Sequence, residues 1–435
     1  MELPDEVVGG AYSFDAWETL ESLTALESRM AGSNGERAAI ETLAERFRDA
    51  GLRDVAVEQF EIPGWERGDS ALTLPDRRYE HQHQLLALPG TPAGEVSGPV
   101  VDVGHGTPAE FEAADLTGAL ALASSTTPDD YDRWLHRREK YHLAVDAGAA
   151  GFLFHNHVPG SLPPTGDVGD RDGPGAIPAV GVSREVGSRL ARRAAGETVQ
   201  ATLGVDCHNG AMASGNVSGR LGPDTDERVL VTAHHDAHDI AEGAGDNGAG
   251  CALVAGLARM LAAVEDRLDT AVRFVTFGAE EIGLRGSRNH VTHTALDGVR
   301  AVVNCDAVGV SRDLGVYTNG FDGLATPFEA AAEAAGVPVE IDGSVEPHSD
   351  HWPFVRQGVP GVMVYSATES DDRGWGHTHG DTLDKLDRRD LRELAVPVAG
   401  AVLRLATGER PAGHVTPADI ERRASAEGYS LDDPA

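Results

Sequence analysis

The pattern of apolar and polar positions changes character twice along the chain. Over residues 13–50, apolar side chains recur at the three- and four-residue spacing of an amphipathic helix, with a break at the turn-forming residues 32–35. Residues 54–62 then alternate apolar and polar, which predicts a half-buried strand. The chain is therefore expected to open with helical segments followed by a strand.

From about residue 68 to 205, short apolar runs are separated by glycine and proline. A charged helix is expected among them at roughly 128–147. Because this pattern differs from the segments on either side, it predicts a small separate domain inserted into the first. The apolar runs lie at 99–103, 118–123, 151–154 and 176–182.

Strands and helices alternate from about residue 210 onward. This alternation predicts an α/β fold, with a mostly parallel sheet covered by helices on both faces. Functional sites in such sheets lie at the carboxyl ends of the strands. The expected strands are 228–233, 272–277, 299–305, 314–318 and 361–366, and the expected helices are 247–263, 284–290, 326–336 and 388–406.

These changes divide the chain into four parts. In the polar tail, Thr416 is placed to cap a short helix, with Pro417 in its first turn. The main domain is formed by residues 1–67 and 206–408, the inserted domain by residues 68–205, and the polar tail by residues 409–435.

Acidic residues outnumber basic ones by almost two to one. The chain has 70 Asp and Glu against 36 Lys and Arg, a net charge of −34, and only Lys140 and Lys385 are lysines. Such a polyanion is repelled by nucleic acid and by anionic membranes. In molar salt the Debye length falls to about 3 Å, so a dense acidic surface no longer repels itself. We therefore expect a salt-adapted (halophilic) protein, with a merely acidic protein from a GC-rich genome as the alternative.

No targeting or membrane segment is expected. Residues 1–6 are acidic, and no apolar run reaches the roughly 18 residues of a membrane-spanning helix. Cys207, Cys251 and Cys305 lie far apart and form neither a disulfide framework nor a metal-binding pair. Free cysteines of this kind predict a reducing compartment, so we expect a cytoplasmic protein.

Histidine and acidic residues stand at the ends of three expected strands. His234 and Asp236 end the first of them, Glu280 and Glu281 follow the second, and Asp306 ends the third. Taken alone, a His-x-Asp or a pair of adjacent acids has little weight in a chain with 18 histidines and 70 acids. Their repeated position at a strand end is what indicates a site.

Two loops add further candidates. Asp246 lies in the glycine-rich turn 243–250, where the alternative role is an ordinary helix cap, and His377 lies in a loop before the last helix. Two imidazoles and three carboxylates are about what two zinc ions sharing one carboxylate require, with positions open for water and substrate. The candidate ligands are His234, Asp246, Glu281, Asp306 and His377, which leaves Glu280 free as a general base.

In this order the motifs resemble the signature of the co-catalytic zinc exopeptidases of metallopeptidase family 28. The resemblance covers about residues 13–65 and 210–405. The inserted region is similar to a protease-associated (PA) domain through residues 147–154 and 177–183. The family motifs H-x-D, G-A-x-D-N-x-x-G, G-E-E-x-G-L-x-G-S, N-x-D and H-T-x-x-D-T correspond here to residues 234–236, 243–250, 278–287, 304–306 and 377–382.

The resemblance implies a fold and an assignment of roles. The fold would be the zinc-exopeptidase fold, a mostly parallel mixed sheet sandwiched by helices, with a small β-rich PA domain inserted. Asp236 would orient His234, Glu280 would act as general base, and the Asp246–Asn247 bond would be a cis peptide. His234 and Asp306 would hold one zinc, Glu281 and His377 the other, and Asp246 would bridge both.

The chain departs from the family pattern at two places. Ala279 stands where many relatives have glycine. Residues 345–348 stand where some relatives carry a tyrosine that stabilises the oxyanion, so His348 is either a substitute donor or a surface residue. Four further histidines lie near motif residues, and we expect them to pack or to orient ligands rather than to bind metal: His235, His238, His351 and His379.

The favoured function is an aminopeptidase that releases N-terminal residues from short peptides, with two zinc ions that manganese or cobalt could replace. A carboxypeptidase or dipeptidase is the main alternative. An arginine such as Arg285, Arg356 or Arg373 at the site would favour it, because guanidinium groups bind carboxylates. A single-zinc aminoacyl cyclase and a non-catalytic binding module are further alternatives, which the complete ligand set and Glu280 argue against. Side-chain preference and oligomeric state stay open.

Overall fold

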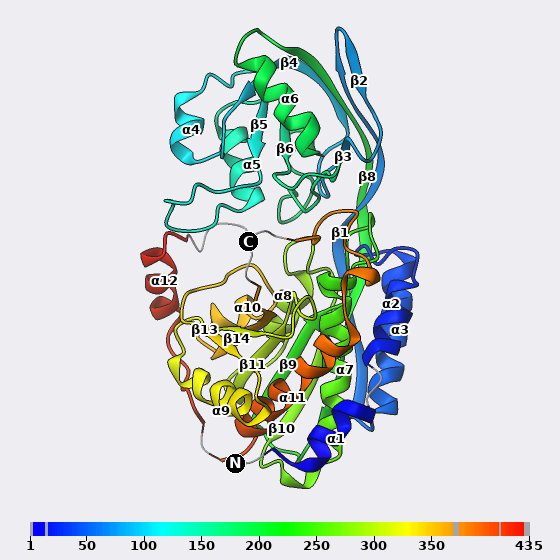
Figure 1. Ribbon diagram of the computed structural model, residues 1–435, viewed down its shortest axis with the longest axis vertical. Coiled ribbons are helices and arrows are strands. Elements are labelled where there is room, and N and C mark those ends of the chain that lie inside the picture. Colours follow the sequence, from blue (N-terminus) through cyan, green and yellow to red (C-terminus); the bar gives the residue numbers. More distant parts are fainter. Residues whose placement is uncertain (1–2, 14–15, 369–373, 409, 430–435) are drawn as a thin grey trace.

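Two strands of 22 residues each, β1 (Arg53–Leu74) and β8 (Gln200–Leu221), run along most of the molecule. They pair antiparallel over almost their whole length. The computed structural model describes residues 3–13, 16–368, 374–408 and 410–429, and Figure 1 shows them as two lobes that this pair of strands connects. The inserted region is thus joined to the main lobe by continuous strands rather than by loops.

The strand expected at 54–62 therefore continues to Leu74. The alternation of apolar and polar residues stops at Pro63, because the strand passes there from one lobe to the other and its side chains pack against different elements. Residues 63–65 nevertheless stay paired with β8. A register shift between Arg67 and Ser70 lies close to the predicted start of the inserted domain at residue 68.

The lower lobe in Figure 1 is built on a sheet in the order β13-β12-β14-β11-β9-β10-β8. Pairing is parallel among β9, β10, β11 and β14, whereas β12 and β8 run antiparallel to β14 and β10. The expected mostly parallel mixed sheet is confirmed. Its strands are β9 (Arg228–His234), β10 (Ala271–Phe277), β11 (Val299–Cys305), β12 (Leu314–Tyr317), β13 (Val339–Asp342) and β14 (Gly361–Ser366). The sequence pattern did not predict β13, which is short and only half-buried.

Helices cover both faces of this sheet, because alternate strand residues point to opposite sides. The helices are α1 (Asp5–Ser13), α2 (Ala16–Thr24), α3 (Asn34–Asp49), α7 (Ala249–Ala262), α8 (Arg285–His293), α9 (Ala325–Ala335), α10 (Trp352–Val355), α11 (Arg388–Leu405) and α12 (Pro417–Ala426). In β9, Val229 and Val231 pack in the large core that includes α7 and α11. Leu230 packs on the other face with Phe354 of α10 and Val291 of α8.

The first helical region differs from its prediction. The region 13–50 contains α2 and α3, and residues 25–33 lie outside both helices. Ser33 begins α3 by accepting a hydrogen bond from the backbone N–H of Glu36. Met30, expected on a helical face, instead packs in a core cluster with residues of β1 and β8. An earlier helix, α1, was not expected.

The upper lobe extends the sheet from β8 through β4, β5, β6 and β7 to β3 (Figure 1). The expected helix at 128–147 is shorter than predicted: residues 125–136, which include Pro128, form bends, a turn and irregular backbone, and His136 caps a helix that begins at Arg137. The strands are β2 (Arg77–Tyr79), β3 (Leu85–Ala87), β4 (Gly94–Asp102), β5 (Leu120–Ser124), β6 (Gly151–His155) and β7 (Ala179–Val182), and the helices are α4 (Pro108–Ala113), α5 (Arg137–Asp146) and α6 (Arg184–Ala194).

The C-terminal tail contacts both lobes. Thr416 caps α12 as expected and forms a capping box with Asp419. The carbonyl of Gly428 accepts a hydrogen bond of 2.7 Å from Arg133 of the inserted lobe. The carboxylate of Glu427 accepts one of 2.8 Å from the backbone of Val345 in the main lobe. The tail therefore ties the two lobes together.

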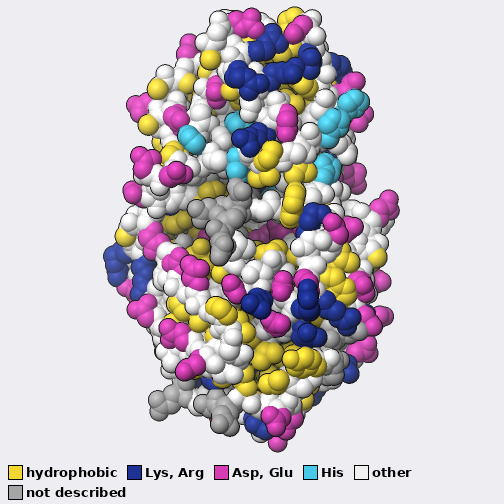
Figure 2. All heavy atoms as spheres, in the orientation of Figure 1, with side chains coloured by type: hydrophobic (Ala, Val, Ile, Leu, Met, Phe, Trp, Pro, Cys, Tyr) yellow, Lys and Arg dark blue, Asp and Glu magenta, His cyan; other side chains and the backbone are white. Residues whose placement is uncertain are grey.

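Acidic side chains are spread over the visible face of both lobes, as Figure 2 shows. This distribution agrees with a net charge of −34 that is not confined to one segment. Within the described ranges of the chain, no helix has both the length and the hydropathy needed to cross a bilayer.

Candidate metal centre

The centre lies at the carboxyl ends of three neighbouring strands of the main lobe. His234 is the last residue of β9, Asp306 directly follows β11, and Glu280 and Glu281 lie just after β10. Parallel strands bring their carboxyl ends to one edge of a sheet, and these side chains meet there. Two loops complete the group, since one before α7 supplies Asp246 and one after β14 supplies His377. All the candidate site residues are thus brought together.

The carboxylate of Asp246 lies between two imidazoles. Its Oδ1 is 3.2 Å from His234 Nε2, and its Oδ2 is 3.1 Å from His377 Nε2. His234 Nε2 also lies 3.6 Å from Asp306 Oδ1, and His377 Nε2 lies 3.4 Å from Glu281 Oε2. Zinc ligands arranged tetrahedrally are about 3.3–3.6 Å from one another. The donor atoms therefore have the spacing that metal binding requires.

We call His234 and Asp306 the sheet half of the centre, and Glu281 and His377 the loop half. The side-chain hydroxyl of Ser349 contacts Asp306 Oδ2. Ser349 Oγ in turn accepts a hydrogen bond of 2.8 Å from the amide of Asn304 in β11. The Asn304 oxygen accepts one of 2.7 Å from Thr232 in β9. A buried chain of polar groups thus fixes Asp306 relative to two strands.

Asp236 holds the two glutamates in place as well as lying beside His234. Its carboxylate accepts hydrogen bonds of 3.0 Å and 3.1 Å from the backbone N–H groups of Glu280 and Glu281. His234 Nδ1 lies 3.1 Å from the Asp236 carbonyl and 3.6 Å from its carboxylate. Burial opposes ionisation of Asp236, but the hydrogen bond and charge of His234 lower its pKa. Asp236 therefore orients residues in both halves of the centre.

Glu280 lies next to the sheet half. One of its carboxylate oxygens is within 4.8 Å of the ligand atoms of His234 and Asp306. Burial, the largest effect, raises the pKa of Glu280 well above its usual value, against the opposing charge of His234. A carboxylate in this position can exchange a proton with a molecule bound at the ligands.

The turn that carries Asp246 is held from both ends. Gly243 has the left-handed φ of 60°, and the Asp246–Asn247 peptide is cis, as the resemblance implied. The Asp381 carboxylate accepts hydrogen bonds of 2.7 Å and 3.1 Å from the backbone N–H groups of Gly245 and Asp246. The N-terminal cap of α7 is Gly248, without a side-chain hydrogen bond, so Asp246 does not serve as the helix cap.

His377 depends on the inserted lobe. Its backbone φ is 56°, which is unusual for a residue other than glycine. His377 Nδ1 lies 3.3 Å from the carbonyl of Thr165, and the Thr165 N–H donates to the His377 carbonyl at 2.8 Å. A partner at Nδ1 fixes the ring and leaves Nε2 for a metal. Thr165 therefore orients a candidate ligand across the domain boundary, and no sequence pattern indicated it.

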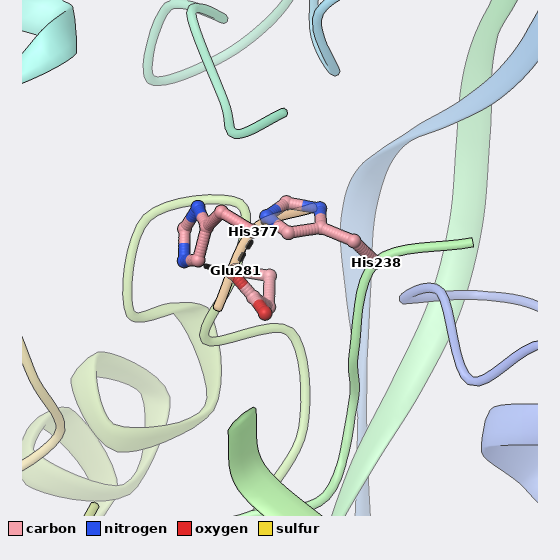
Figure 3. A group of neighbouring side chains, drawn as sticks. All are labelled: His238, Glu281 and His377. Atoms are coloured by element: carbon pink, nitrogen blue, oxygen red, sulfur yellow. Dashed lines mark ion pairs between the residues drawn. The ribbon is translucent and has the colours of Figure 1, made fainter. Parts of the chain in front are cut away.

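His238 lies closer to the ligands than expected. Its Nε2 is 2.8 Å from Glu281 Oε2, and the centre of its ring is 4.6 Å from that of His377. Figure 3 shows the two rings on either side of the Glu281 carboxylate. The neighbouring Asp239 pairs with Arg67 of β1 at 2.6 Å, and this ion pair holds the loop against the connecting strands.

A second buried arginine, Arg29, holds the same loop near both of its ends. Its guanidinium donates to the backbone carbonyls of His235, Glu242 and Gly243 at 3.0, 2.6 and 2.7 Å. Arg29 lies between α2 and α3, and nothing in the apolar pattern indicated this role. The loop between His234 and Asp246 is thus fixed by side chains that are distant in the sequence.

The remaining candidates lie outside the centre. His348 stacks on His136 of the inserted lobe at 4.9 Å and its Nδ1 is 2.8 Å from Glu346. His379 Nδ1 lies 2.9 Å from the Ile240 carbonyl. Arg285 donates to carbonyls of the inserted lobe, at Asp170 and Arg171, rather than facing the ligands. His235 and His351 are fully buried, and Arg373 lies outside the described residues.

Comparison with known proteins defines the class. The family model described as peptidase family M28 matches residues 216–402, and the model of the PA domain matches residues 96–190. Aminopeptidase YwaD of Bacillus subtilis (strain 168) is 29% identical over 402 residues, which cover 89% of this chain and 83% of the relative.

Solved structures agree with this class. BSAP, a zinc aminopeptidase from Bacillus subtilis, is 28% identical, covers 95% of this chain and 98% of its own, and superposes with a TM-score of 0.70. An aminopeptidase from Aneurinibacillus sp. strain AM-1 gives the same identity, coverage and TM-score. The fold and the site are those of a metallopeptidase. The chain belongs to peptidase family M28 and carries an inserted PA domain.

Proposed function

We propose that this protein is a two-zinc aminopeptidase that releases N-terminal residues from short peptides. The observation that carries the proposal is the Asp246 carboxylate, whose two oxygens face different imidazoles at 3.2 Å and 3.1 Å. One carboxylate between two sets of ligands is what a pair of ions requires. The similar proteins named above include aminopeptidases, and one of them is a zinc enzyme.

The sheet half and the loop half would each hold one ion, with Asp246 shared between them. Zinc at these ligands would lower the pKa of a coordinated water toward neutrality and polarise the peptide carbonyl. Manganese or cobalt could replace zinc, since carboxylates supply most of the ligand atoms.

Glu280 would act on the proton of the attacking water. Its carboxylate lies beside the sheet half, where it can take that proton and later transfer it to the nitrogen of the leaving amine. Asp236 would keep Glu280 in place through the backbone N–H that it accepts at 3.0 Å.

The choice of the amino end over the carboxyl end rests on two observations. The relatives named above are aminopeptidases. Arg285, one candidate for capturing a substrate carboxylate, is turned toward the carbonyls of Asp170 and Arg171. A carboxypeptidase would need a guanidinium directed at the centre.

The first experiment is digestion of an unblocked tripeptide of three different residues, in near-molar KCl with zinc. We expect mass spectrometry to show loss of the N-terminal residue, and an N-acetyl group on the peptide to abolish it. Loss of the C-terminal residue would establish the carboxypeptidase instead. A folded protein that binds two ions and cleaves neither end would overturn the catalytic proposal.

We also propose that the protein is salt-adapted and cytoplasmic. A net charge of −34 and free cysteines support this proposal. Melting temperature should rise steeply as KCl is increased from dilute buffer to molar concentration. A melting temperature independent of KCl would contradict the salt adaptation.

A further inference from the structure

His238 is a buried imidazole whose nitrogens lack hydrogen bonds. Only 5% of the residue is exposed, and among the described residues neither Nδ1 nor Nε2 has a hydrogen-bond partner. A buried polar atom without a partner is unfavourable, because it has lost its hydrogen bonds to water. One of these atoms, Nε2, faces the candidate metal centre, where a bound ion would be its partner.

The ring points at the loop half. Nε2 lies 2.8 Å from Glu281 Oε2, but the contact does not have the alignment of a hydrogen bond. His238, Glu281 and His377 each offer a ligand atom, and these three atoms lie within 4.8 Å of one another. Figure 3 shows the three side chains converging from separate segments of the chain. His377 Nε2 lies 3.4 Å from the same Glu281 oxygen, which is the spacing of two ligands on one zinc, and the 2.8 Å contact of His238 would lengthen to that spacing around a shared ion.

We propose that His238 is an additional protein ligand of the ion held by Glu281 and His377. The inference rests on the proposed two-zinc centre and goes beyond it, because the sequence motifs supply five ligands and His238 is not among them. It also revises the expectation that His238 only packs or orients a ligand.

The consequence is an asymmetric centre. With Asp246 shared, the loop half would have four protein ligands: His238, Glu281, His377 and Asp246. The sheet half would have three: His234, Asp306 and Asp246. Four protein ligands are typical of closed structural zinc sites, and three with an open position are typical of catalytic ones. The loop-half ion would therefore be retained more tightly, and the open position next to Glu280 would belong to the sheet half.

The test compares His238→Phe with wild type in the full-length protein in near-molar KCl. Phe keeps an aromatic ring of similar size and removes both nitrogens. His290→Phe is the matched control, because His290 is a buried imidazole, 4% exposed, that packs between Phe277 and Phe354 and lies 3.6 Å from Glu58 rather than beside a candidate ligand. Metal-free protein is titrated with Co²⁺ while visible absorption is followed, and bound metal is counted after dialysis.

We expect wild type and His290→Phe to bind two ions. In His238→Phe, the affinity for one ion should fall by about 100-fold or more, since loss of an orienting group alone costs about 10–100-fold. The cobalt absorption of that ion should change as well, because a nitrogen leaves its coordination. Wild-type affinity, or weaker binding with an unchanged cobalt spectrum, would overturn the proposal.

A second variant covers the case in which His238→Phe does not fold. His238→Cys retains a group that can bind metal and should add a sulfur-to-cobalt charge-transfer absorption in the near ultraviolet. A folded His238→Cys protein with two bound ions and no such absorption would also overturn the proposal. If wild type itself binds fewer than two ions, the two-zinc function fails. If wild type binds two ions and the variants behave like it, only the role of His238 fails.

Discussion

The two halves of the metal centre are built by different parts of the molecule. In the sheet half, the groups that orient the ligands all belong to the main lobe: Ser349, Asn304 and Thr232 hold Asp306, and Asp236 lies beside His234. In the loop half, His377 is oriented by Thr165 of the inserted lobe. One half is therefore complete within a single domain, whereas the other needs two domains in contact.

This difference makes the contact between the lobes part of the site. Arg67 of the main lobe donates to the Thr165 hydroxyl of the inserted lobe at 3.3 Å, and to Asp239, next to His238 in the sequence, at 2.8 and 2.6 Å. The Arg67 side chain is only 6% exposed, so this ion pair is partly shielded from salt. Displacement of the inserted lobe should disturb the loop half before the sheet half. The predictions below separate the two halves.

Replacing Glu280 should have the largest effect on turnover and should leave the metal affinity of each half unchanged. Because Glu280→Gln removes the proton acceptor and neither half's ligands, kcat should fall by about 10²–10⁴-fold while both ions stay bound. Steady-state kinetics and metal analysis would check this, with the exposed Glu41→Gln as control. A variant with nearly wild-type kcat would remove Glu280 from the mechanism.

Replacing Ser349 should weaken the sheet half alone. In Ser349→Ala, Asp306 loses the hydroxyl that contacts its Oδ2, and affinity for one ion should fall by about 10–100-fold. The Co²⁺ titration should show that the other ion, bound in the loop half, keeps its affinity. The exposed Ser97→Ala, whose hydroxyl bonds to Thr202, is a suitable control. Equal weakening of both ions would mean that the halves are not independent.

The sheet half could be predicted from the sequence because its residues stand at strand ends. Hydrophobic runs located β9, β10 and β11, and the carboxyl ends of these parallel strands meet at one edge. Asp246 was included because it lies in the glycine-rich turn 243–250, whereas Asp381 lies in the family motif at 377–382 without having been given a role. Short sequence patterns were therefore enough to locate the ligands of the sheet half.

The groups that complete the centre could not be predicted in this way. Thr165 and His377 are 212 residues apart, and Arg29 reaches carbonyls more than 200 residues away. Such contacts leave no periodic pattern, because they depend on how the lobes dock. The same reason explains β1, whose alternation breaks at Pro63 although the strand continues. His238 was placed near the motifs, but its direction depends on the fold of its loop.

Replacing Thr165 should lower the metal affinity of the loop half, by less than Ser349→Ala lowers that of the sheet half. Thr165→Pro removes the N–H that donates to the His377 carbonyl at 2.8 Å, and affinity for one ion should fall by about 10-fold. Thr165→Val keeps both backbone groups and loses only the 3.3 Å contact of the hydroxyl with Arg67, so its affinity should stay close to that of wild type. The cobalt titration would show which ion is affected, by comparison with Ser349→Ala. Loss of the same ion in both variants would contradict a loop half that depends on the inserted lobe.

The smallest effect on the centre is expected from replacing Lys140. This substitution tests whether the stability of the inserted lobe can change without altering the activity that depends on the sheet half. Lys140 is fully buried in that lobe, and its Nζ donates to the carbonyls of Ser124 and Thr126 at 2.8 and 2.7 Å. Burial lowers the pKa of Lys140 to about 7, although the charges of Glu110 and Glu139 oppose the shift.

An unfolded lysine has a pKa of about 10.4, so between pH 7 and 10 the unfolded chain binds a proton that the folded chain lacks. The free energy of unfolding should therefore rise with pH in this range, by at most about 1.4 kcal/mol per pH unit from this group, and below pH 7 its contribution should be constant. Lys140→Met should remove this part of the pH dependence, while Lys385→Met, at the only other lysine, should keep it. Guanidinium unfolding of wild type and both variants at several pH values would measure this dependence.

Because Lys140 lies away from the ligands, the kcat of Lys140→Met at neutral pH should stay within about twofold of wild type. A large loss of kcat would show that the stability of the inserted lobe also controls the sheet half.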